Sequence, residues 1–118
     1  MDKELIDSAA GRSLCDLTLT GCNIVDVLGG RILENASVSI KNGYVVGLND
    51  SHEARESLDL GGKYLAPGLI DAHVHIESSL LTPAEYAKVV LPRGTTTVVA
   101  DPHEIVNVLG YDGMRFML

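Results

Sequence analysis

Basic residues are scarce in this sequence, and long apolar runs are absent. Nine Lys and Arg stand against sixteen Asp and Glu, which gives a formal net charge of -7. Because nucleic acids and anionic membranes attract clustered basic side chains, this balance argues against either as a partner. No apolar stretch approaches the roughly 18 residues of a membrane span, and the first residues lack the basic then apolar order of a signal peptide. The sequence predicts a cytoplasmic protein.

Cysteine is scarce as well. Cys15 and Cys22 are the two cysteines of the sequence, and their spacing is that of neither a CxxC metal site nor a secreted disulfide framework. We therefore expect free, partly buried thiols. The 46% hydrophobic and 21% charged composition is ordinary for a globular protein, so the function has to be sought in motifs.

Residues 14–66 carry short apolar alternations interrupted by Gly and Asn, a pattern typical of small antiparallel strands. Two such alternations, at 37–40 and 44–48, lie on either side of Asn42-Gly43. Asn-Gly readily adopts the positive φ angles of a type I′ turn, so this stretch predicts a β-hairpin. We expect residues 14–66 to form a small β-sandwich segment.

The two stretches before this hairpin are less regular. A further strand is expected over residues 17–27 with a break near Gly21, because glycine inside a strand pattern indicates a bulge. Residues 1–13 mix charged and apolar side chains, and predict an amino-terminal extension that forms a short helix or a loosely held terminus.

Residues 67–118 show a different pattern, of strand and helix in alternation. A strand is predicted over 69–76, and Thr82-Pro83 followed by Glu85 is typical of a helix start. This helix should end near 93–94, before a second strand over 95–100 and a helix that begins near Gly110. A repeat of about 26 residues predicts the first two βα units of a (β/α)₈ barrel, so we expect an α/β protein that is truncated after its second unit.

The first of these strands carries an unusual alternation of ionisable and apolar residues. Side chains at every second position of a strand share one face, which places Asp71, His73, His75 and Glu77 together. Ionisable groups inside a barrel are unfavourable without compensation, and a divalent cation provides it. We expect His73 and His75 to be metal ligands rather than satisfied core histidines. Asp71 is expected either to orient a ligand or to cap the strand start.

The second strand ends in another polar group, Asp101-Pro-His103-Glu104. Catalytic groups of (β/α)₈ barrels lie in the loops after the strands, so these side chains are candidates for substrate binding or an additional metal site. The alternative is structural, with Asp101 or Glu104 capping the amino terminus of a helix.

Several segments of the sequence resemble the amidohydrolase superfamily. The segment Leu65–Ile76, LAPGLIDAHVHI, is similar to the first barrel strand of that superfamily, and the β-rich residues before it resemble its small β-sandwich domain. Glu77-Ser78-Ser79, the run PRGTTT at 92–97 and the run DPHEIVNVLG at 101–110 resemble the adenine deaminases among its members. The resemblance extends from about residue 14 to the end.

The resemblance implies an enzyme with two divalent metals, manganese or iron, with zinc as a further candidate. His73 and His75 would bind one of them, and an activated water would attack the purine carbon that carries the amino group. The reaction would convert adenine to hypoxanthine and ammonia in purine salvage. Glu77, Ser78 and the Asp101, His103 and Glu104 group are the candidates for contacts to the substrate or to an additional metal. The complete enzyme is expected to be a homo-oligomer.

Three functional interpretations remain open at this stage. The bridging carboxylate, the remaining ligands and the catalytic acid or base of the superfamily come from later strands, so the 118-residue chain alone is expected to be inactive. It could instead be a non-catalytic remnant or one half of a split protein, which pairs with a partner through open strand edges. A different amidohydrolase, such as a dihydroorotase or hydantoinase, is the third interpretation.

Overall fold

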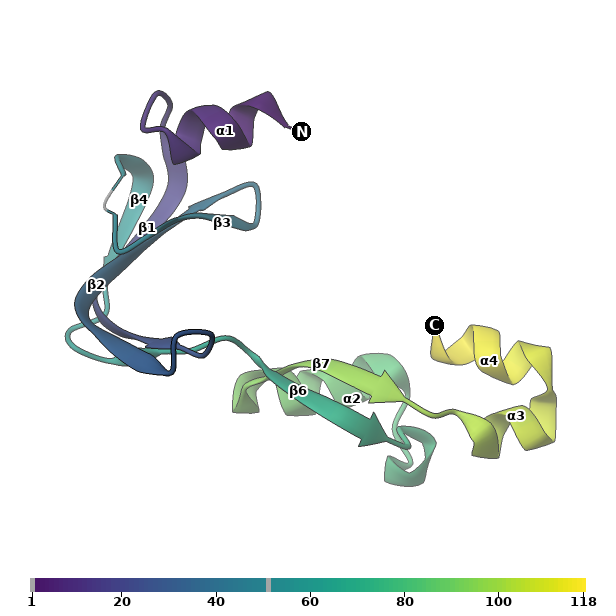
Figure 1. Cartoon of the computed structure of the whole chain (residues 1–118). Helices are drawn as coiled ribbons and strands as arrows, with labels where there is room; N and C mark the ends of the chain where they lie inside the picture. The colour runs from purple at the N-terminus through teal and green to yellow at the C-terminus, as the bar shows by residue number, and fades with distance from the viewer. Residues whose placement is uncertain (1, 51) are drawn as a thin grey trace. The chain divides into compact units, whose positions relative to one another are not determined.

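A computed structural model describes residues 2–50 and 52–118 (Figure 1). The chain divides into two compact units, Met1–Pro67 and Gly68–Leu118. This boundary falls between Pro67 and Gly68, directly before the strand predicted over residues 69–76. The finer assignment to three domains, at 1–13, 14–66 and 67–118, stays a prediction.

The first unit is built on one mixed sheet. Its elements in the described residues are α1 (Lys3–Ala9), β1 (Cys15–Asp26), β2 (Arg31–Lys41), β3 (Tyr44–Leu48), β4 (Ala54–Asp59) and β5 (Tyr64–Leu65). The strand order is β3-β2-β1-β4, and β5 pairs with the second half of β1. The short helix α1 is one of the two states expected for the first residues. The sheet confirms the β-rich nature of this segment.

The predicted hairpin is confirmed. β2 and β3 pair antiparallel with Lys41 opposite Tyr44, and the turn residues Asn42 and Gly43 have φ angles of 50° and 77°. Asp16 on β1 anchors this turn, because its carboxylate accepts the Asn42 amide at 2.8 Å and the Lys41 ammonium at 3.1 Å. The break predicted near Gly21 is also present, since the β1–β2 register shifts between Leu19 and Cys22.

The expectation of antiparallel strands throughout this unit is wrong for β4 and β5. Both run parallel to β1, with Leu17 opposite Glu56 and Asn23 opposite Tyr64. The chain passes from β3 at one edge of the sheet to the opposite side of β1, so β4 follows the direction of β1. Alternation of apolar and polar residues shows which face a side chain takes, but it carries no information on strand direction.

The core of the first unit lies on β1 and β2. Cys22, Ile24, Ala36 and Val38 are buried there in one hydrophobic cluster. Cys15 and Cys22 are free and fully buried, so the thiols are more enclosed than the sequence suggested. Burial raises the pKa of the Cys15 thiol, which keeps it protonated at neutral pH.

The second unit begins with two parallel strands, joined through a helix (Figure 1). Its elements are β6 (Leu69–Val74), the 3₁₀ turn η1 (Glu77–Ser79), α2 (Pro83–Val90), the 3₁₀ turn η2 (Leu91–Arg93), β7 (Thr95–Ala100), α3 (His103–Leu109) and α4 (Tyr111–Met117). The order strand, helix, strand, helix is that of the predicted βα units.

The start of α2 is as predicted, whereas α2 itself ends at Val90 and only the helical segment that continues through η2 reaches the predicted end at 93–94. Thr82 is the N-cap and its hydroxyl accepts the Glu85 amide at 3.4 Å, while Pro83 takes the first helical position. After the 3₁₀ turn η2, which contains Pro92, Gly94 ends the helical segment with a φ of 100°. The left-handed conformation is the reason that glycine fits there.

Two predicted boundaries differ from the structure. β6 ends at Val74 rather than Ile76, because the chain turns into a helical conformation at Ile76 before η1. The helix α3, which starts directly after Pro102, was expected only in the structural alternative, in which Asp101 or Glu104 caps a helix. A glycine at 110 with a φ of 58° separates α3 from α4, so the predicted helix near 110 is the second of two.

No helix of the described residues is long and apolar enough to span a membrane.

Candidate metal centre

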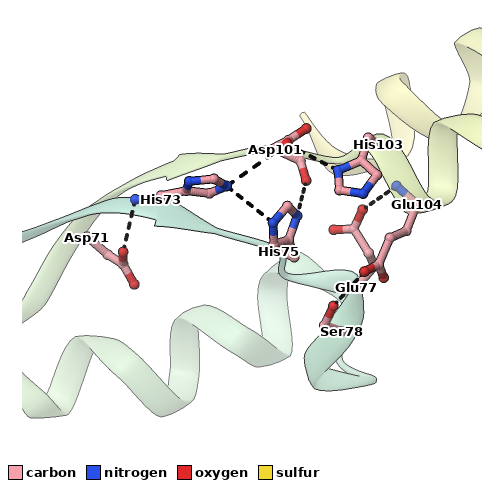
Figure 2. A network of polar contacts seen from close by, with 8 residues as sticks. All are labelled: Asp71, His73, His75, Glu77, Ser78, Asp101, His103 and Glu104. Atoms are coloured by element: carbon pink, nitrogen blue, oxygen red, sulfur yellow. Dashed lines mark hydrogen bonds and ion pairs between the residues drawn. The ribbon is translucent and has the colours of Figure 1, made fainter.

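Two imidazoles converge at the end of β6. His73 lies in the strand and His75 follows its last residue, and their Nε2 atoms are 3.2 Å apart (Figure 2). Two nitrogens that each lie about 2.0–2.1 Å from one tetrahedral zinc ion are about 3.3 Å apart. The separation of the two imidazole nitrogens therefore fits a shared divalent cation.

A backbone contact fixes the tautomer of His75. Its Nδ1 lies 2.8 Å from the carbonyl oxygen of Asp101, at the end of the neighbouring strand. Because a carbonyl oxygen only accepts hydrogen bonds, Nδ1 carries the proton and Nε2 presents its lone pair. Such a hydrogen bond also holds the ring in place, as is usual for histidines that bind metals.

The carboxylate of Asp101 completes a set of three potential ligands. Ligand atoms of His73, His75 and Asp101 lie within 4.8 Å of one another, and Asp101 Oδ2 is 4.0 Å from His73 Nε2. The side chain of His103 donates a hydrogen bond to the same oxygen at 3.1 Å, which lowers the pKa of Asp101 below its ordinary value. Asp101 is therefore ionised at neutral pH, as metal binding requires.

A second set of potential ligands overlaps the first. His75, His103 and Glu104 also offer ligand atoms within 4.8 Å of one another. Since Nδ1 of His75 is engaged with the Asp101 carbonyl, only its Nε2 is free, and a neutral imidazole nitrogen binds one ion at a time. The two sets therefore compete for His75. The close His73 nitrogen favours the first set.

The remaining candidate residues surround these ligands. Asp71 accepts the backbone amide of His73 at 3.1 Å, and Figure 2 shows its carboxylate pointing away from the imidazole pair. It contacts the main chain rather than a ring. The β6–β7 register shifts between Asp71 and Val74, which disturbs the strict alternation on which the shared face was predicted.

Glu77 and Ser78 lie in η1, directly after the imidazole pair, and both reach the start of α3. Glu77 Oε1 lies 3.2 Å from the Glu104 amide nitrogen, and the Ser78 hydroxyl donates to Glu104 Oε1 at 2.9 Å. The structural alternative for this segment placed Asp101 or Glu104 as the cap of α3. Its N-cap is Pro102, which makes no capping side-chain hydrogen bond.

These contacts were not predicted from the sequence, because they join η1 to the start of α3, and a helix at that point was considered only with a cap from Asp101 or Glu104. The available signal was the sequence Asp101-Pro102, since proline is common at helix starts.

The two strand ends are brought together by backbone pairing, in which the Asp101 amide donates to the Val74 carbonyl at 3.0 Å. Parallel strands end at one edge of a sheet, so residues 26 positions apart meet there.

Comparison with known proteins gives a consistent family. The amidohydrolase family model matches residues 64–118. The adenine deaminase of Listeria welshimeri is 48% identical over 116 residues, and that of Nitratidesulfovibrio vulgaris is 54% identical over 115 residues. Each match covers 98% of this chain and 20% of the relative, so the chain spans about a fifth of the length of the curated relatives it matches.

Solved structures agree on the fold. An L-hydantoinase from Arthrobacter aurescens has a TM-score of 0.57 and 31% identity, and the similarity covers 75% of this chain and 21% of that one. The N-acyl-D-glutamate deacylase of Bordetella bronchiseptica, solved with zinc and a phosphonate inhibitor, has a TM-score of 0.56 and 27% identity over 75% of this chain and 19% of its own. The chain thus belongs to the amidohydrolase family, and is homologous to the amino-terminal portion of its adenine deaminases.

Proposed function

We propose that this chain is the metal-binding amino-terminal part of an adenine deaminase, which hydrolyses adenine to hypoxanthine and ammonia. The observation that carries the proposal is the convergence of His73 Nε2 and His75 Nε2 at 3.2 Å beside the Asp101 carboxylate. The identity of about half the residues to curated adenine deaminases supports the substrate.

The residues present fit a divalent cation. His73 and His75 would hold it through Nε2, and Asp101 would supply a third, anionic ligand. A divalent metal at such a site would supply Lewis-acid chemistry and would lower the pKa of water from its bulk value towards about 7. The backbone carbonyl of Asp101 keeps the His75 proton on Nδ1, so Nε2 remains available as a ligand. We propose manganese or iron as the metal, with zinc as the further candidate.

Exchange of the matching segment tests this function. The amino-terminal fifth of the Listeria welshimeri adenine deaminase would be replaced by this chain, and ammonia release from adenine would be measured after loading with manganese. We expect turnover by the chimera, and at least about a 100-fold loss in a His75→Ala chimera, because one metal ligand is removed.

The same chimera separates the alternatives. A folded chimera that binds manganese but leaves adenine unchanged would contradict the proposal, and hydrolysis of dihydroorotate or a hydantoin would then favour the other amidohydrolases. A chimera that neither binds metal nor turns over adenine, beside an active parent enzyme, would favour the non-catalytic remnant.

A further inference from the structure

The helix that follows β7 has no capping side chain of its own. Pro102 occupies the N-cap position of α3, and no side-chain hydrogen bond caps the helix from there. The first amides of a helix have no partner within it, and proline carries no side-chain acceptor. These amides therefore depend on an acceptor from another part of the chain.

Glu77 is that acceptor. Its Oε1 lies 3.2 Å from the Glu104 amide nitrogen and 3.5 Å from that of Ile105, across 27 and 28 positions of sequence. The neighbouring Ser78 hydroxyl adds a link to the Glu104 carboxylate at 2.9 Å. Figure 2 shows both side chains reaching from η1 to Glu104 at the start of α3.

We propose that Glu77 is a positioning residue, which holds the segment 101–104 against the imidazole pair by accepting the backbone amides of α3. The inference rests on the proposed function only for its effect on metal binding. The contact between the two segments stands on the geometry alone.

The burial of one carboxylate oxygen of the half-buried Glu77 argues for this role. Its Oε2 is buried and has no hydrogen-bond partner among the described residues. A buried carboxylate oxygen without a partner is unfavourable. A serine or aspartate at position 102 would satisfy the same amides without that burial. Such a local cap would not join the two strand ends, whereas Glu77 does.

The segment that Glu77 holds contains the groups around the candidate metal centre. The rings of His75 and His103 lie 4.8 Å apart at 85°, and His103 in turn donates to the Asp101 carboxylate. Up to Asp101 the segment is fixed by two backbone contacts, to Val74 and His75. Beyond that residue, loss of the Glu77 contacts would release His103 and with it the orientation of the Asp101 carboxylate.

The test compares Glu77→Ala and Glu77→Gln in the 118-residue chain. Glutamine keeps an oxygen that accepts the two amides, whereas alanine keeps none. Glu85→Ala is the matched control, because it removes the same side chain from the same unit, where the carboxylate pairs with the exposed Lys88. Nuclear magnetic resonance would report the contact between the rings of His75 and His103. Absorption of Co²⁺ during titration would report metal affinity and ligand set.

We expect Glu77→Ala to lose the contact between the rings of His75 and His103 and to change the Co²⁺ spectrum. Co²⁺ binding should weaken by about 10-fold or more, since partners that orient metal ligands have effects of this size. Glu77→Gln and Glu85→Ala should keep the contact and bind within about threefold of the original chain. Equal loss in the alanine and glutamine variants would overturn the inference, as would an intact ring contact in Glu77→Ala.

Two further outcomes are distinguishable. If the unsubstituted chain binds no Co²⁺, the proposed function fails, and the ring contact in the glutamine and alanine variants still decides the role of Glu77. If Glu77→Ala does not fold, the comparison of Glu77→Gln with Glu77→Asp decides, because aspartate keeps the charge but is too short to reach the amides. Retention by glutamine and loss by aspartate supports the inference, and the reverse overturns it.

Discussion

Gly68 lies directly before β6 and beside the Thr96 side chain of β7. A Cβ atom on this glycine would lie 2.7 Å from the Cβ of Thr96, and still nearer to that side chain's Oγ1 and Cγ2. Rotation about χ1 moves Oγ1 and Cγ2 of Thr96, but leaves its Cβ where the backbone puts it. Gly68→Ala therefore forces the start of β6 away from β7.

The destabilisation expected for Gly68→Ala follows from the 2.7 Å between the added Cβ and the Cβ of Thr96. Two carbon atoms pack best at about 3.5 Å or more, so the strands would have to separate locally by about 0.8 Å. Overpacking of this kind destabilises a protein by about 1–3 kcal/mol. Thr96→Gly removes the obstructing Cβ, at a cost of its own of about 0.5–1 kcal/mol relative to alanine in a strand. Gly68→Ala should be nearly free of strain in that background.

Equilibrium urea unfolding, followed by circular dichroism, would measure the free energies of the two single variants and the double variant. We expect a coupling free energy of about 1 kcal/mol or more, because the substitutions act on one contact. If Gly68→Ala costs the same with Thr96 as with glycine there, to within about 0.5 kcal/mol, the close approach of the two strands is refuted.

Three further predictions concern pH, helix packing and activity. The Asn42 amide and the Lys41 ammonium lower the pKa of Asp16 below 3.8. The ionised carboxylate therefore stabilises the fold above that pH, and this contribution is lost as the pH falls through the lowered pKa. Asp16→Asn should flatten the loss of stability that acid titration measures below about pH 5, and an unchanged profile would contradict this prediction. Gly113→Ala would place a Cβ 2.7 Å from the Ile105 carbonyl oxygen, and should reduce helical circular dichroism by separating α3 from α4, whereas an unchanged spectrum would argue against their close packing. The 118-residue chain alone, loaded with manganese or iron, should release no ammonia from adenine, because among the described residues β6 and β7 each pair on one side only, which leaves the His73 and Asp101 side chains open to solvent. Robust turnover would show that it supplies a complete site.

The elements that were predicted correctly are those with local causes. The hairpin at Asn42-Gly43 and the helix start at Thr82 each depend on a few adjacent residues, whose backbone preferences act over one turn. The parallel direction of β4 and the contact of Glu77 with the start of α3 were not predictable in this way. The first is set by how the chain crosses the sheet, and the second joins residues that lie 27 positions apart in the sequence.

The same distinction holds within the candidate metal centre. The pairing of His73 with His75 follows from their spacing in a strand, and needs no knowledge of the neighbouring strand. The place of Asp101 depends on the register between β6 and β7, which shifts between Asp71 and Val74. For this reason the sequence indicated Asp101 only as one member of a polar group after the second strand.

The number and charges of the potential ligands His73, His75 and Asp101 indicate whether a metal held by them would suit a structural or a catalytic role. His73 and His75 are neutral as ligands and Asp101 contributes one negative charge, so a divalent ion held by the three would keep a net charge of +1. Structural zinc sites have four protein ligands, whereas catalytic ones have three protein ligands and keep one position open. A set of three that retains positive charge is therefore suited to polarising a bound molecule rather than to stabilising the fold. The exposure of the His73 and Asp101 side chains, at 68% and 51%, is consistent with access for such a molecule.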